Sequence, residues 1–190
     1  MASKPPVNPG EILIAEYHYI AQTVFQANEK SARVTSFDVT AIGSLIAPLI
    51  TTQLSITPEK LIWFYWGFAG LFLALALRGM LTILELARMR SSWFESIMAM
   101  NRIKNYYFEH FEPIKEAFAW RTETAPKKFK INSVGFMLVT QVAILSASAL
   151  GASVFFALEA ITGNLFFNPA IIIGLLFFAF QLFLYRNNLK

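Results

Sequence analysis

Long apolar stretches dominate the pattern of hydrophobic and polar positions along this chain. Residues 61–77, extended by residues 80–84, and residues 134–161 are almost entirely apolar, and residues 170–185 form a shorter but more strongly apolar run. A helix that crosses the hydrocarbon layer of a bilayer needs about 20 mostly apolar residues. The three stretches are therefore predicted to be membrane-spanning helices.

A fourth span is predicted over residues 37–56, although this stretch is more polar than the others. It contains Asp38, several hydroxyl side chains and an internal proline, Pro48. Without this span the chain would cross the membrane an odd number of times, and the apolar residues of the stretch would lie in water. We therefore predict an all-α integral membrane protein with four transmembrane helices, arranged as two hairpins over residues 37–84 and 132–186.

Turn signals pair the predicted spans. Residues 57–59 (Thr-Pro-Glu) combine a threonine N-cap, a proline at the first helical position and an acid in the first turn. Residues 168–169 (Asn-Pro) are predicted to start the last span in the same way. Residues 162–164 (Thr-Gly-Asn) are predicted to end the span before it.

Two segments outside the spans also have a helical repeat. After Pro9, apolar residues recur every three or four positions, which predicts an amphipathic helix in segment 1–36. No Gly or Pro interrupts residues 80–112, so the second span is predicted to continue into segment 85–131 as a cytoplasmic stalk about 40 Å long. An apolar stripe on the stalk is expected to pack on the N-terminal helix and on another subunit: Trp93, Ile97, Met100, Ile103, Tyr107 and Phe111.

The Lys and Arg residues predict the orientation of the spans. Of the 16 basic residues, all except Lys60 and Arg78 flank the predicted spans on one side. Because basic residues favour the cytoplasmic side, segments 1–36 and 85–131 and the tail, 187–190, are expected in the cytoplasm. The first 36 residues contain no apolar stretch of signal-peptide length. The expected location is a bacterial cytoplasmic membrane.

The composition agrees with a membrane protein and limits the chemistry. Hydrophobic residues make up 56% and charged residues 15% of the chain, whereas soluble domains carry about 25% charged residues. The absence of cysteine excludes disulfides and thiolate metal sites. The net charge is +4, but no nucleic-acid-binding motif is present, so no nucleic-acid partner is expected. Three lysines before the third span are expected to anchor anionic lipid headgroups: Lys127, Lys128 and Lys130.

Charges at the ends of the spans are the first candidates for function, because a charge in hydrocarbon is costly. Asp38, Arg78 and Glu159 are predicted to lie close to the membrane boundaries. Asp38 can pair there with Arg33 or Arg78. No charge is predicted at the midplane, which argues against a proton-coupled transporter.

Small and polar residues of the first and third spans form two further candidate sets. Small residues spaced by four allow close helix contact. They are predicted to join these two spans within one bundle, or to form a subunit interface: Gly43, Ala47, Ala143, Ala147 and Gly151. The polar set is a candidate for lining a water path: Thr40, Ser44, Thr51, Thr140, Gln141 and Ser148. The last span, rich in Phe and Leu, is predicted to face lipid.

No catalytic, cofactor-binding or metal-binding motif is found in the sequence, so no cofactor is expected. The leading hypothesis is a non-enzymatic, oligomeric membrane protein whose cytoplasmic helices bind a partner or receive a signal. One alternative is a pore lined by the polar set. The other is a membrane enzyme that acts on lipid and uses Glu109, His110 and Glu112, with His18 alongside.

Overall fold

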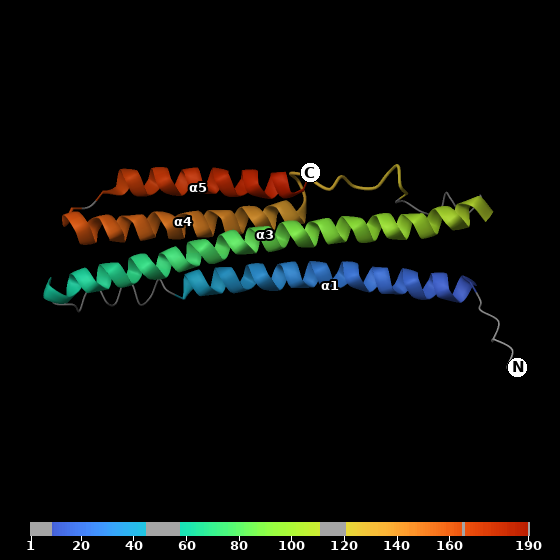
Figure 1. Ribbon diagram of the computed structural model, residues 1–190, viewed down its shortest axis with the longest axis horizontal. Helices are drawn as coiled ribbons and strands as arrows, with labels where there is room; N and C mark the ends of the chain where they lie inside the picture. Colours follow the sequence, from blue (N-terminus) through green and yellow to red (C-terminus); the bar gives the residue numbers. More distant parts are fainter. Residues whose placement is uncertain (1–8, 45–57, 111–120, 165, 190) are drawn as a thin grey trace, which may run out of the picture. The chain divides into compact units, whose positions relative to one another are not determined.

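The computed structural model describes residues 9–44, 58–110, 121–164 and 166–189, which contain four helices and no strand (Figure 1). The helices are α1 (Pro9–Gly43), α3 (Pro58–His110), α4 (Val134–Thr162) and α5 (Phe167–Asn188). The all-helical prediction is confirmed for these residues.

Three of the described helices are long and apolar enough to cross a membrane. The candidate spans are Leu61–Glu109, Val134–Thr162 and Phe167–Asn188. The predicted span over residues 37–56 begins inside α1, but most of it lies outside the described residues, so the count of four spans stays a prediction. Helix α1 continues without a break through Phe37 to Gly43.

The ends of α4 follow from local chemistry. The Ser133 hydroxyl accepts a hydrogen bond from the Phe136 backbone N–H at 3.2 Å, which caps the first turn. At the other end, Gly163 has φ 65° and its N–H donates to the Glu159 carbonyl at 2.9 Å. This left-handed conformation favours glycine. The predicted stop at residues 162–164 is therefore confirmed.

The starts of α3 and α5 differ in how well they were predicted. Helix α3 begins at Pro58, as expected. Helix α5 begins at Phe167, before the predicted first helical residue, Pro169, and its N-cap Phe166 makes no side-chain cap. The predicted cap at Asn168 is therefore wrong. Pro169 fits inside the first turn because the first four N–H groups of a helix have no acceptor within that helix.

The chain divides into two compact units. Unit 1 comprises Met1–Lys30 and Met89–Lys128, and unit 2 comprises Ser31–Arg88 and Phe129–Lys190. Helices α1 and α3 contribute residues to both units.

Unit 1 is built around facing segments of α1 and α3. Ile20 and Ile97 are buried, and the hydroxyl oxygens of Thr23 and Ser96 lie 3.5 Å apart. The Arg90 guanidinium lies 3.9 Å from the Trp93 ring centroid, and its Nε donates to the Lys128 carbonyl at 3.0 Å. Arg90 therefore holds the segment that returns from α3.

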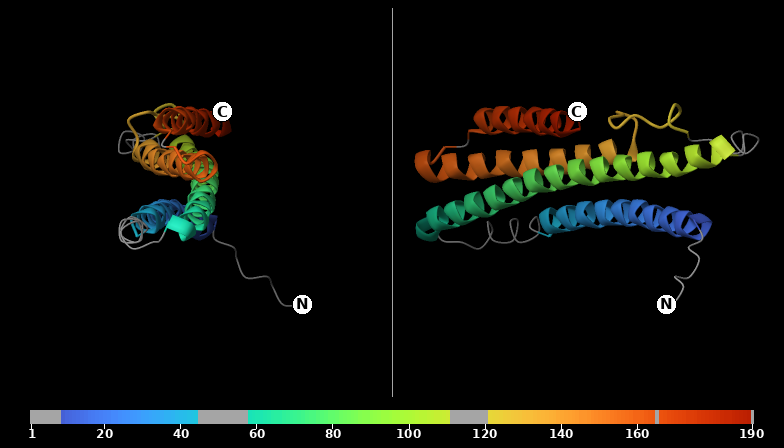
Figure 2. Two further views of the ribbon diagram at one scale, coloured as in Figure 1. Left: turned by 90° about the vertical axis from the view of Figure 1, so that its left-hand side faces the viewer. Right: turned by 45° about the vertical axis from the view of Figure 1, so that its right-hand side comes forward.

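Unit 2 has a core shared by three helices, and α4 and α5 lie side by side in both views of Figure 2. A Cβ atom added to Gly174 would lie 3.1 Å from the Ala147 carbonyl oxygen, and one added to Gly151 would lie 3.1 Å from that of Ala170. Glycine at these positions therefore permits the close approach of α4 and α5. The buried cluster at the other end of the hairpin consists of Ile83, Leu86, Ala87, Val139, Val142, Ala143, Tyr185 and Leu189.

Candidate functional site

Two pairs of polar side chains, with one member from each helix, join the helices of unit 2. Asp38 of α1 pairs with Arg78 of α3. The next residue, Gly79, packs against Ser146 of α4, and Ser146 is hydrogen-bonded to Gln181 of α5. We call Asp38, Arg78, Ser146 and Gln181 the polar layer.

In the charged half of the polar layer, the Asp38 carboxylate is buried and the Arg78 side chain is partly exposed. Arg78 Nε lies 3.6 Å from Asp38 Oδ1, and the two side chains are 45% and 5% exposed, respectively. The guanidinium also lies 5.4 Å from the Phe37 ring centroid. Asp38 Oδ2 is buried and has no hydrogen-bond partner among the described residues. The Asp38 carboxylate therefore depends on Arg78, one of the two partners that the sequence offered.

In the neutral half of the polar layer, each buried side-chain polar atom has a partner. The Ser146 hydroxyl donates to Gln181 Oε1 at 2.9 Å and accepts from Gln181 Nε2 at 2.7 Å. Gln181 is 0% exposed. This role was not predicted, because the Phe- and Leu-rich sequence of the last span indicated a lipid-facing helix. A lone glutamine in an apolar helix was the available signal, since such side chains usually hydrogen-bond to a neighbouring helix.

The polar layer lies inside the helices of unit 2. At 1.5 Å per residue, Ser146 is about 18 Å from the first residue of α4, and Gln181 is about 10 Å from the last residue of α5. Because Gly79 touches Ser146, Arg78 lies at the same level of unit 2 as Ser146. Its predicted position close to a membrane boundary stays a prediction. Another hydroxyl also joins helices in this unit, since Ser153 donates to the Ala69 carbonyl at 2.8 Å.

The small residues of α4 contact α5. Ala147 and Gly151 approach Gly174 and Ala170 of α5, because the tight turn at Gly163 folds α5 back onto α4. Most of the predicted first span lies outside the described residues, so its contact with these small residues stays a prediction. Ala143 belongs to the core cluster of unit 2. A Cβ added to Gly43 would meet nothing within 4 Å, and Ala47 lies outside the described residues.

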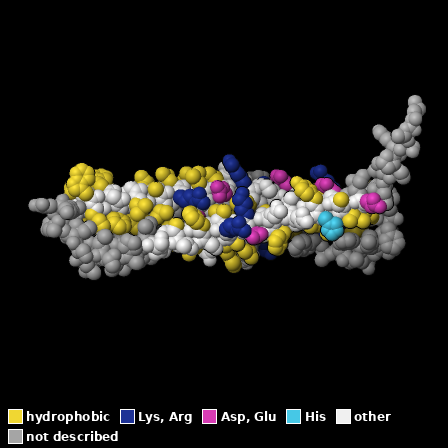
Figure 3. Space-filling view, turned by 90° about the horizontal axis from the view of Figure 1, so that it is seen from below, with side chains coloured by type: hydrophobic (Ala, Val, Ile, Leu, Met, Phe, Trp, Pro, Cys, Tyr) yellow, Lys and Arg dark blue, Asp and Glu magenta, His cyan; other side chains and the backbone are white. Residues whose placement is uncertain are grey.

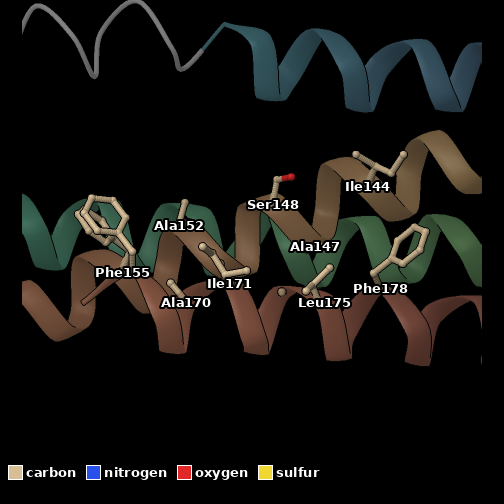
Figure 4. Close-up of a pocket in the computed structure, with 12 residues that line it drawn as sticks. Ile144, Ala147, Ser148, Ala152, Phe155, Ala170, Ile171, Leu175 and Phe178 are labelled. Atoms are coloured by element: carbon tan, nitrogen blue, oxygen red, sulfur yellow. The ribbon is translucent and has the colours of Figure 1, made fainter. Parts of the chain in front are cut away.

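An apolar groove lies along α4 and α5 (Figure 4). Its volume is about 480 Å³. In Figure 4, Ile171 and Leu175 of α5 point toward α4, and Phe155 and Phe178 lie at opposite ends of the row. Ser148 contributes a hydroxyl to the lining.

The other residues proposed for a water path differ in exposure and in hydrogen bonding. The hydroxyls of Thr40, Ser44 and Thr140 each donate at 2.9 Å to a carbonyl of their own helix, as hydroxyls in apolar helices commonly do. Gln141 is exposed on α4, as is Ser148. Thr51 lies outside the described residues. The water path stays a prediction.

Unit 1 contains a cavity of about 300 Å³ between α1 and α3. Three residues of the predicted stalk stripe line it: Trp93, Ile97 and Met100. Ile103 and Tyr107 are half-buried, and Phe111 lies outside the described residues. The complete lining is Ala21, Val24, Asn28, Trp93, Ile97, Met100, Asn101 and Lys104.

Asn101 is the most unusual residue of this cavity. It is 1% exposed, and neither its Oδ1 nor its Nδ2 has a hydrogen-bond partner within the described part of the chain. Leaving buried polar groups unpaired costs about 1–3 kcal/mol each. Burial also lowers the pKa of the nearby Lys104 ammonium, because desolvation disfavours its charged form. The sequence analysis singled out neither residue.

The enzyme alternative stays a prediction, because part of its residue set lies outside the described residues. Within the described ranges, no group of three His, Asp or Glu side chains could hold a metal ion. Glu109 is exposed, while Glu112 and the His110 side chain are not described. Glu159 forms a hydrogen bond with the Tyr65 side chain. The carbonyls of Lys127 and Lys128 accept from Arg90 at 3.4 and 3.0 Å, and that of Lys130 accepts from Ser133 at 2.7 Å.

Comparisons with known proteins add no family to this picture. No protein-family model matches the chain, and neither the curated proteins nor the solved structures contain a match. The polar layer and the unit 1 cavity are thus the two described places where buried polar chemistry is concentrated. The polar layer can hold helices together, and the cavity can accept a ligand with polar and apolar parts.

Proposed function

We propose that the protein is a multi-pass membrane protein that works as a non-enzymatic receptor. Unit 2 lies in the bilayer, and unit 1 lies in the cytoplasm and binds a partner or signal. The membrane is most simply a bacterial cytoplasmic membrane, with both termini on its inner side.

The exposed apolar surface carries this proposal. Among the described residues, the exposed large apolar side chains lie in unit 2, except Ile14, Tyr19, Phe25 and Tyr106. Trp63 is 78% exposed, and Figure 3 shows hydrophobic side chains exposed on one face. Contiguous apolar surface of this extent is unfavourable in water and is solvated by lipid tails.

Basic and aromatic residues support the orientation. Lys127 and Lys130 are exposed beside the start of α4, and the Arg186 guanidinium near the end of α5 lies 5.9 Å from the Phe129 ring centroid. Basic residues favour the cytoplasmic side, and aromatic residues favour both interfaces. Trp63 and Trp66, close to the start of α3, are placed for the opposite interface.

Self-association is part of the proposal. Gln141 and Ser148 are exposed on α4 among apolar neighbours. In a bilayer, polar side chains of this kind are best satisfied against another helix. We expect purified protein in nanodiscs to have the mass of at least two copies, and a strict monomer at high concentration would contradict this part.

Single-cysteine labelling tests the membrane arrangement, because the natural chain has no cysteine. We would compare Gln22→Cys, Lys127→Cys and Asn164→Cys in intact cells with a maleimide that cannot cross membranes. Asn164→Cys should be labelled directly, and the other two only after permeabilisation. Labelling of Lys127→Cys from outside would overturn the orientation. If one of Gln22→Cys and Lys127→Cys were labelled from outside and the other only after permeabilisation, the two residues would lie on opposite sides of the membrane. The chain would then cross it an odd number of times between them, which would exclude the span over residues 37–56.

A further inference from the structure

The unit 1 cavity has the chemical layout of a ligand site. Ala21, Val24, Ile97 and Met100 supply apolar walls, while the polar residues Asn101 and Lys104 line the cavity from neighbouring turns of α3. At 1.5 Å per residue, Asn101 and Trp93 are separated by about 12 Å along α3. The cavity therefore suits an elongated molecule with a polar head and an apolar body. Its volume of about 300 Å³ is at the small end of ligand pockets.

The buried amide of Asn101 determines which hydrogen-bonding groups the polar head of a ligand needs. Its Nδ2 needs an acceptor and its Oδ1 needs a donor, because both atoms are buried without a partner in the described ranges. A carboxamide presents a donor and an acceptor side by side and can pair with both atoms. A carboxylate accepts only, and would leave Oδ1 unpaired. An uncharged amide therefore matches Asn101 better than an acid does.

We propose that the unit 1 cavity binds a small acyl amide, with its carboxamide paired to Asn101 and its apolar chain lying along Val24, Ile97 and Met100 toward Trp93. Both Asn101 amide atoms are covered in the ligand-free chain, so the proposal requires the side chain to rotate toward the ligand on binding. The ligand amide supplies the two hydrogen bonds that the folded chain leaves unmade. This inference rests on the proposed receptor function and gives that receptor a ligand class.

Octanamide is the probe, and Trp93 is the reporter. The full chain in lipid nanodiscs would carry Trp63→Phe, Trp66→Phe and Trp120→Phe, which leaves Trp93 as the sole tryptophan. Octanamide should change Trp93 fluorescence in a saturable way, and protein-free nanodiscs correct for partition into lipid. Methyl octanoate, which accepts but cannot donate, and octanoate, which is an anion, should each bind at least tenfold more weakly.

Three variants separate recognition from general effects. Asn101→Leu keeps the side-chain size and should weaken octanamide binding about tenfold or more, since it removes both hydrogen bonds. Gln22→Leu makes the same kind of change at an exposed position of α1 and should leave binding unchanged. Ala21→Phe fills the cavity but keeps Asn101, and should abolish binding even if Asn101→Leu fails to fold.

The proposal is overturned if octanamide gives no saturable signal, if Asn101→Leu or Ala21→Phe binds it like the parent chain, or if octanoate binds more tightly than octanamide. The last outcome would assign recognition to the Lys104 ammonium and the ligand to the fatty acids. The labelling experiment distinguishes the two proposals. If the chain is inserted as predicted but does not bind octanamide, only the proposed ligand class is contradicted. If the labelling shows another insertion, the proposed receptor function is contradicted as well.

Discussion

Gln181 in unit 2 and Asn101 in unit 1 are both buried primary amides on long helices, but their surroundings are opposite. Gln181 exchanges two hydrogen bonds with Ser146. Asn101 makes none with the described residues, although it lines a cavity. A buried amide with a partner contributes to the fold, whereas one without a partner costs free energy until a partner arrives. The comparison separates a structural polar group from a candidate recognition group.

The largest expected effect comes from the charged half of the polar layer. Arg78→Leu should lower the free energy of unfolding by about 3 kcal/mol, because it leaves the buried Asp38 carboxylate without its cation. The double variant with Asp38→Leu should recover most of this loss. Thermal unfolding in nanodiscs measures both. If Arg78→Leu alone were as stable as the parent chain, Asp38 would not depend on Arg78.

Gln181→Leu should destabilise unit 2 by about 1 kcal/mol, because the buried Ser146 hydroxyl loses its hydrogen bonds to α5 and keeps, among the described residues, only the 3.3 Å bond to the Ala143 carbonyl of its own helix. Adding Ser146→Ala should bring the stability back toward that of the parent chain, since no polar group is then left unpaired. A double-mutant cycle gives the coupling free energy. Additive effects of the two changes would show that the hydrogen bonds contribute nothing.

Asn101→Leu should have the opposite sign, with stabilisation of up to about 1 kcal/mol in the absence of ligand. The variant exchanges an amide without partners for an apolar side chain of similar size. Its unfolding temperature, measured beside that of Gln181→Leu, directly tests the contrast between the two amides. Equal destabilisation by both substitutions would mean that Asn101 supports the fold in the same way as Gln181.

The smallest effect concerns Lys104. Because its pKa is lowered from the ordinary lysine value of 10.5, the unfolded chain binds more protons than the folded chain between the two pKa values. The free energy of unfolding should therefore rise slightly with pH through that interval. Lys104→Met should remove this slope, as denaturant unfolding at a series of pH values measures. A slope that persists in Lys104→Met must come from another group.

Much of the helical architecture could be predicted because it depends on local pattern. The uninterrupted apolar period over residues 80–112 predicted a continuous helix, and α3 extends without a break to His110. The stop after α4 followed from Gly163, whose positive φ favours glycine. The Asp38–Arg78 pair was among the partners suggested by charge alone.

The polar contacts between helices could not be predicted because they depend on register. Asn101 lies on a helix that also carries charged residues, and only its packing in unit 1 shows that it is buried. Gln181 was visible as a lone amide in an apolar run, but its partner depends on how α5 lies on α4. The same register gave Ala147 and Gly151 the glycine and alanine of α5 as neighbours.

The α4–α5 hairpin has one more consequence, for the order of assembly. The turn at Gly163, the close backbone approach at Gly151 and Gly174, and the Ser146–Gln181 bonds are all internal to it. Because these residues are translated after α1 and α3, the hairpin can close through its own contacts while the earlier helices are already made. The contacts of Ser153 and Ser146 with α3 then form in a later step, when the closed hairpin packs against α3.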